Sequence, residues 1–162
     1  MGFLRACAYK ALSDSRLTTL VGRCFSEHAF DKFGLLQTPP GCSHSLTSGI
    51  VFGIYEYSER FLIRRHLLSN LDVVELGASI GIVSRQIMHQ LDASRCLIAV
   101  EALPALAKLA RRNISAAHPG RDYQLVEAAI AYGTKRVSFD SGAEHISARI
   151  ANEPGQTDES ST

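Results

Sequence analysis

The sequence predicts an α/β fold in which parallel strands alternate with helices. Short apolar runs at 72–76, 96–100 and 123–128 have the length of strands, and stretches of helical periodicity separate them. A glycine-rich turn at 77–81 joins the first strand to the first of these helices. The 19 residues between the first two strands suffice for a helical crossover and are too many for a hairpin, which favours parallel pairing.

Residues 1–48 are expected to form an N-terminal extension, with helices near 3–12 and 16–30. The segment TPPGCSHSLTSG, which follows the second of these helices, is rich in Pro, Gly and Ser and is predicted to be a loop. A partial domain is expected over 49–150.

The first helix of that domain is predicted at 56–68, where YSERFLIRRHLL has apolar residues at helical spacing. It is expected to be amphipathic and to lead into the core. Its polar side is expected to carry Glu59, Arg60 and Arg64.

The helix after the glycine turn is expected to bury one face and expose the other. The buried face would contain Ile80, Val83, Ile87, Met88 and Leu91, and the exposed face Arg85, Gln86, His89 and Gln90.

The second half of the domain repeats the pattern. CLIAV at 96–100 is a continuous apolar run, typical of a parallel strand covered on both faces. Pro104 suits the first turn of the next helix, where its missing N–H costs nothing. A turn at 133–136 and a short strand at 137–139 follow the third strand, and a flexible polar tail is expected at 151–162.

The amino-acid composition argues against several classes of protein. The 162 residues carry 17 basic and 16 acidic side chains, a net charge of +1, which argues against a dedicated nucleic-acid-binding protein. The longest apolar candidate for a membrane span, at 49–55, has only the length of a strand. Arg5 and Lys10 interrupt the apolar residues at the N-terminus, so a cytoplasmic location is expected. Four widely spaced cysteines predict reduced thiols and no metal site.

The glycine turn and two acidic residues form the candidate ligand site. A glycine-rich turn between a strand and a helix lets a ligand approach the backbone without meeting a Cβ atom. Glu101 ends the neighbouring strand, 20 residues after Gly81, a spacing at which a carboxylate accepts both hydroxyls of a ribose. Glu75 precedes Gly77 by two residues. This arrangement is typical of a nucleotide-binding site.

The spacing of the glycines indicates which kind of nucleotide the turn is suited to bind. The turn has the pattern G-x-x-x-G (Gly77, Gly81), whereas dinucleotide-binding folds have G-x-G-x-x-G, and no GK[ST] is present. An NAD-binding domain therefore remains the less favoured alternative.

VVELGASIGIVS followed by AVEALPALAKLARRNI resembles the first two motifs of class I S-adenosylmethionine-dependent methyltransferases. Within that superfamily the chain is most similar to the FkbM-type enzymes, a resemblance carried also by GIYEYSE and EAAIAYGTKRVSFD. It covers roughly residues 50–150. The resemblance implies a Rossmann-like sheet and S-adenosylmethionine as the cofactor.

The resemblance also implies roles for individual residues. The methionine part of the cofactor would lie against Gly77, Ala78 and Ser79, Glu75 would orient this loop, and Glu101 would hold the ribose. The cofactor-binding residues it implies are Glu75, Gly77, Ala78, Ser79, Gly81, Glu101, Ala102 and Ala128. Tyr55 and Glu56 would close over the cofactor, and Glu127 would border the adenine with Ala128.

Members of this family methylate oxygen atoms, often hydroxyls of sugars or polyketides, so a small-molecule acceptor is implied and no catalytic residue is identified. The family's sheet has seven strands, and only strands 1 to 3 and a short hairpin strand are expected here. The chain therefore resembles the N-terminal portion of such an enzyme. A non-catalytic remnant, acting as a nucleotide-binding or interaction module, is the alternative.

Overall fold

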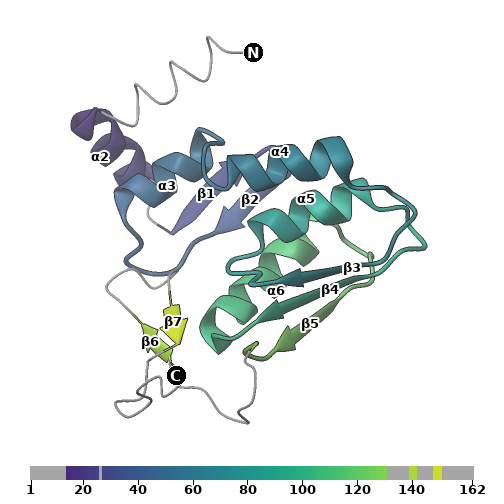
Figure 1. Cartoon of the computed structure of the whole chain (residues 1–162). Helices are drawn as coiled ribbons and strands as arrows, with labels where there is room; N and C mark the ends of the chain where they lie inside the picture. Colours follow the sequence, from purple (N-terminus) through teal and green to yellow (C-terminus); the bar gives the residue numbers. More distant parts are fainter. Residues whose placement is uncertain (1–13, 26, 131–138, 142–147, 151–162) are drawn as a thin grey trace, which may run out of the picture.

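The computed structural model describes residues 14–25, 27–130, 139–141 and 148–150 (Figure 1). Within these ranges the protein is a mixed α/β structure. The helices are α2 (Ser15–Cys24), α3 (His44–Val51), α4 (Tyr57–His66), α5 (Ile82–Gln90) and α6 (Pro104–Ala117). The strands are β1 (His28–Asp31), β2 (Gly34–Gln37), β3 (Val73–Leu76), β4 (Leu97–Glu101), β5 (Gln124–Glu127), β6 (Phe139–Ser141) and β7 (Ala148–Ile150).

The predicted parallel sheet is confirmed. Its strand order is β3-β4-β5, and both pairings are parallel. The register places Glu75 opposite Ala99, and Glu101 opposite Glu127. Because the strands run in the same direction, their carboxyl ends and the turn after β3 lie at one edge of the sheet (Figure 1).

Helices cover one face of this sheet. Leu97 and Ala99 of β4 are fully buried in a core with Ile87 and Met88 of α5 and Ala110 of α6. Burial of such aliphatic side chains is the main source of folding free energy.

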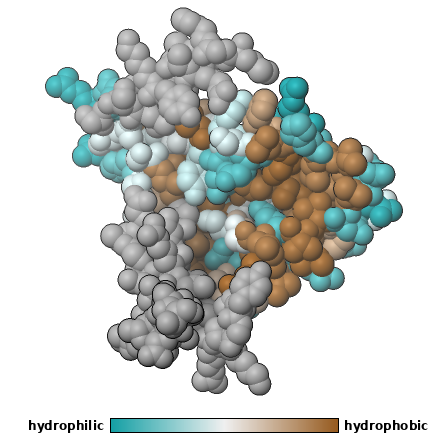
Figure 2. All heavy atoms as spheres, viewed as in Figure 1, coloured by the Kyte–Doolittle hydropathy of each residue, from teal (hydrophilic) through white to brown (hydrophobic). Residues whose placement is uncertain are grey.

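The opposite face is not covered by the described residues, contrary to the prediction for 96–100. Val74 and Leu76 are 61% and 63% exposed, and Ile98 and Val100 are only partly buried. Figure 2 shows hydrophobic side chains gathered over the strands on this side. Alternate residues of each strand therefore face a core and an open apolar surface.

The helix predicted at 16–30 is shorter than expected, and a β-hairpin begins at its predicted end. Helix α2 ends at Cys24, and β1 and β2 pair in an antiparallel register, with Ala29 opposite Leu36. Both of these side chains are fully buried. The Asp31 side chain accepts a hydrogen bond from the Phe33 N–H at 2.7 Å, and Gly34 has a φ of +98°, so the tight turn has both an acceptor and a glycine.

The segment predicted as a loop at 38–49 contains most of helix α3. Ser43 caps this helix by accepting a hydrogen bond from the Leu46 N–H at 3.2 Å. Thr47, Ser48 and Ile50 are buried against the hairpin and α2, which compensates for the low helix propensity of this sequence.

Helices α4 and α5 form where predicted, and Glu59, Arg64 and His89 are exposed as expected, but three other residues of their predicted polar sides are buried. Arg60 of α4 is 5% exposed, while its neighbours Phe61 and Leu62 are 39% and 53% exposed. Arg85 and Gln86 of α5 are fully buried. The β1–β2 hairpin packs on the side of α5 that was expected to face water, as Asp31 and Phe33 both contact Arg85.

Several predictions fall outside the described residues: the helix at 3–12, the turn at 133–136 and the tail at 151–162. Of the short strand predicted at 137–139, Phe139 begins β6, which pairs with β7 in an antiparallel hairpin. Among the described helices, none has the length and apolar character needed to cross a bilayer.

Candidate functional site

The turn between β3 and α5 has an unusual backbone. Gly77, Ser79 and Gly81 have φ values of +88°, +49° and +84°. Left-handed conformations at three of five residues reverse the chain sharply, and glycine adopts them at the lowest cost. The turn thus leads directly from the carboxyl end of β3 into α5.

The N–H groups of the turn are largely used within the protein. Gly77 and Ala78 donate hydrogen bonds to the Val100 carbonyl at 2.8 and 2.9 Å. Ser79 donates to the Glu101 carboxylate at 2.7 Å, and Gly81 donates to the Ala78 carbonyl at 2.8 Å. Because four of its five N–H groups are engaged, the turn lacks the free donors of a phosphate-binding loop.

Glu101 fastens the turn to the start of α6. One carboxylate oxygen accepts the bond from Ser79, and the other accepts a bond from the Leu103 N–H at 2.9 Å. The residue is 7% exposed. A carboxylate has about four acceptor positions, so roughly two remain for donors of a ligand, such as a pair of hydroxyls.

Glu75 lies beneath the same turn and is 9% exposed. Its carboxylate accepts a hydrogen bond from the Ser84 hydroxyl at 2.6 Å. The pKa of Glu75 is raised to about 7, chiefly by burial; the hydrogen bond from Ser84 opposes this shift, and the charge of Glu101 adds to it. Close to pH 7 both the protonated and the ionised forms of this carboxyl group are therefore populated.

A third carboxyl group belongs to Glu56, which precedes α4 with a φ of +50°. Burial raises its pKa to about 7, and the charges of Glu59 and Glu75 add to this shift, whereas Arg60 opposes it. We call Glu56, Glu75 and Glu101 the acidic cluster. None of the three forms a salt bridge with a basic residue in the part of the chain that the structure describes.

The two glycines of the turn have different surroundings. A Cβ atom at Gly81 would lie 3.1 Å from the Ala110 Cα and 3.2 Å from the Ile114 side chain, so this glycine allows α6 to pack against the turn. A Cβ atom at Gly77 would meet nothing within 4 Å. The Ser79 hydroxyl is buried and has no hydrogen-bond partner among the described residues. Open space and an unpaired hydroxyl at one turn fit a bound molecule.

The other predicted site residues lie outside this turn. Ala128 donates a backbone hydrogen bond to the Glu101 carbonyl at 3.1 Å, and Glu127 pairs with Glu101 across the sheet. Ala102 follows Glu101 directly and is partly buried. Tyr55 packs against the core formed by the hairpin, α3 and α6.

Two residues that hold the site were not identified from the sequence. The sequence pattern places Ser84 on the helix after the turn and assigns it no role, yet its hydroxyl donates the hydrogen bond to Glu75. Asn113 is 1% exposed. Its side-chain NH2 donates hydrogen bonds to the Ile80 carbonyl at 2.8 Å and to the Gln37 carbonyl at 2.9 Å. Its side-chain oxygen accepts a hydrogen bond from the Gln37 N–H at 2.8 Å. Asn113 is a lone polar residue on an apolar face of α6, and this pattern could have predicted a buried hydrogen-bonding role for it.

No protein-family model, no curated protein and no solved structure matches this chain.

Proposed function

We propose that the turn and the acidic cluster bind S-adenosylmethionine, and that the protein is an FkbM-type class I methyltransferase with a Rossmann-like sheet. The observation that carries this proposal is the acidic cluster, which forms no salt bridge among the described residues and lies beside the open space at Gly77. A ligand with positive charge would supply the missing cation.

The chemistry of the residues fits this cofactor. S-adenosylmethionine carries a positive sulfonium and an ammonium group, which complement Glu56 and Glu75. Its ribose offers two hydroxyl donors to the remaining acceptor positions of Glu101. The few free N–H groups of the turn agree with a nucleoside that has no phosphate. The same feature counts against NAD, which carries a pyrophosphate.

The role of the protein in the reaction would be to position the reactants. When bound, S-adenosylmethionine supplies a methyl group that is already activated by the positive sulfur. The turn would hold the methyl-donating end of the cofactor. The acceptor oxygen would be kept at about 3 to 3.5 Å from the methyl carbon, in line with the bond that breaks. We propose a hydroxyl of a sugar or a similar small molecule as the acceptor.

Isothermal titration with S-adenosylmethionine tests the binding site. Gly77→Asn places a side chain in the open space, while asparagine tolerates a positive φ better than most residues. Gly120→Asn is the matched control, because Gly120 has a φ of +75° and equally open surroundings at a turn after α6. We expect Gly77→Asn to abolish binding and Gly120→Asn to leave it unchanged; equal affinities of the two variants would refute the site.

The exposed apolar face of the sheet favours a second candidate, a non-catalytic interaction module. Large exposed apolar patches often mark protein interaction surfaces. Val74, Leu76 and Val126 provide such a patch. Transfer of a radiolabelled methyl group to a panel of monosaccharides separates the candidates, since a module would bind the nucleoside without transfer.

A further inference from the structure

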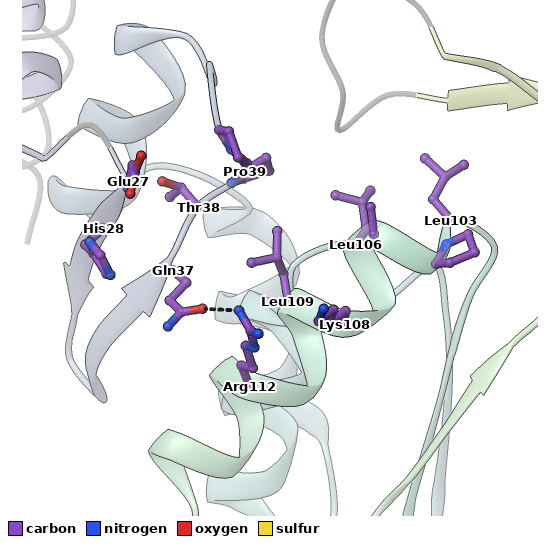
Figure 3. A pocket seen from close by; sticks show the side chains of 13 residues that line it. Glu27, His28, Gln37, Thr38, Pro39, Leu103, Leu106, Lys108, Leu109 and Arg112 are labelled. Carbon is purple, nitrogen blue, oxygen red and sulfur yellow. Dashed lines mark hydrogen bonds between the residues drawn. The ribbon is translucent and has the colours of Figure 1, made fainter.

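A cavity lies between α6 and the end of the β1–β2 hairpin with the segment that follows it (Figure 3). Its volume is about 770 Å³, which is within the range of small-molecule sites. Neither the turn nor the acidic cluster contributes a lining residue. The cavity therefore shares no lining residue with the turn or the acidic cluster, although Leu103 of its lining donates its N–H to the Glu101 carboxylate.

Two cationic side chains line this cavity from α6. Lys108 and Arg112 are one helical turn apart, so they extend from the same side of the helix (Figure 3). Among the residues that the structure describes, Arg112 makes one long hydrogen bond, at 3.4 Å, to the Gln37 side chain. A bond of this length is weak, which leaves most of the guanidinium donors for a ligand. Glu27 is the acidic residue of the lining, so the cations are in excess.

A buried hydroxyl also lines the cavity. Thr38 is 4% exposed, and its Oγ1 has no hydrogen-bond partner in the described part of the chain. An unpaired buried hydroxyl is unfavourable. A ligand with a polar group near Thr38 would remove this cost.

The remaining wall is apolar. It consists largely of proline and leucine side chains: Pro39, Pro40, Leu103, Pro104, Leu106 and Leu109. In Figure 3 Leu106 and Leu109 project from α6 on the side that faces Pro39. This wall suits a ring or a short hydrocarbon chain.

We propose that the cavity binds a small organic anion with an apolar body. Lys108 and Arg112 hold its carboxylate or phosphate, and the leucines and prolines contact its apolar part. Thr38 hydrogen-bonds a polar group of the ligand. The proposal does not depend on the function of the turn.

Calorimetric titration with phenyl phosphate and with benzoate tests this proposal and distinguishes the two kinds of anion. We expect at least one of them to bind, and phenol, which is neutral at pH 7, to bind much more weakly. Absence of binding by both anions at millimolar concentration would overturn the proposal.

The charge requirement is tested with a matched pair of double variants. Lys108→Ala/Arg112→Ala should weaken binding of the anion by roughly tenfold or more, because charge-assisted hydrogen bonds are lost. Arg65→Ala/Arg111→Ala removes the same net charge from exposed positions outside the cavity and should have little effect. Equal affinities of these two double variants would overturn the proposal.

Thr38→Val tests the hydroxyl. Valine has nearly the same shape, so the unliganded protein should keep its thermal stability or gain slightly, because an unpaired polar group is removed. The affinity for the anion should fall several-fold. An unchanged affinity would overturn the role of Thr38.

Discussion

The protein buries two groups of ionisable side chains that differ in charge balance. In the first group, Arg85 and Asp31 form a salt bridge of 3.2 Å in which the two side chains are 0% and 1% exposed. The second group is the acidic cluster, whose carboxyl groups form no salt bridge among the described residues. The first group thus holds the hairpin to α5, whereas the second has the negative charge that the proposed cationic ligand would require.

Arg60 connects the two groups. It is 5% exposed, and its charge interacts with both Asp31 and Glu56. Burial lowers the pKa of Arg60, while both carboxylates act in the opposite direction. A change of charge in one group should therefore influence the other.

Replacing Asp31 should have the largest effect. Asp31→Asn leaves Arg85 and Arg60 buried without their shared anion, so the free energy of unfolding should fall by about 3 to 5 kcal/mol. Urea denaturation measures this loss. Asp72→Asn is the control, because its 3.9 Å pair with Arg95 is exposed, and such pairs contribute at most about 1 kcal/mol. Similar losses in both variants would contradict the structural role of the first group.

Removing a charge from the acidic cluster should increase the free energy of unfolding. The pKa of Glu75 is raised to about 7, so the folded state binds more protons than the unfolded state between the ordinary pKa of 4.5 and about 7. Stability due to Glu75 is therefore present at low pH and is lost as the pH rises through this window.

Glu75→Gln should thus stabilise the protein by about 2 to 3 kcal/mol at pH 8 and have little effect at pH 4.5. Glutamine also keeps an acceptor for Ser84. Urea denaturation at the two pH values, with Glu59→Gln as an exposed control, measures the difference. Destabilisation by Glu75→Gln at pH 8 would show that the carboxylate is balanced by a cation.

Ser84→Ala should have a smaller effect than either of these changes. It removes the 2.6 Å hydrogen bond to the Glu75 carboxylate, a loss of about 1.5 kcal/mol at pH 8, where the acceptor is charged. The loss should decrease at pH 5, because Glu75 is then protonated. Ser115→Ala removes an exposed hydroxyl contact with Tyr123 and serves as the control. A loss independent of pH would contradict the coupling to Glu75.

The smallest predicted effect is on ligand affinity. A cationic ligand favours the charged forms of Glu56 and Glu75, whose pKa values are about 7. Binding should therefore release protons, and the affinity for S-adenosylmethionine should rise several-fold from pH 6 to pH 8. Calorimetry in buffers of different ionisation enthalpy measures the released protons. An affinity that falls with pH would argue against a cation at the acidic cluster.

Local patterns predicted the sheet and its turn correctly. The strands at 72–76, 96–100 and 123–128 lie within one or two residues of β3, β4 and β5. Helix α6 begins at Pro104, as predicted. Apolar runs and glycine spacing are properties of neighbouring residues, so they can be recognised without knowledge of the rest of the chain.

The same reasoning failed where a distant segment provides the partner. Arg85 and Gln86 were expected to face water because polar residues on one side of a helix usually do. The β1–β2 hairpin covers that side, and Asp31 lies 54 residues before Arg85 in the sequence. The predicted helix at 16–30 includes the first three residues of β1, and no strand is predicted at 31–37, so no partner for Arg85 was expected.

By itself, the sequence determined the parallel strands, the glycine turn and the presence of Glu75 and Glu101 at one edge of the sheet. Parallel strands end on the same side, which is sufficient for that inference. Only the tertiary structure decided that burial raises the pKa of Glu56, that Ser84 donates to Glu75, and that Asp31 neutralises Arg85. The physical reason is that pKa values and ion pairing depend on burial and on neighbours in space, which come from segments far apart along the chain.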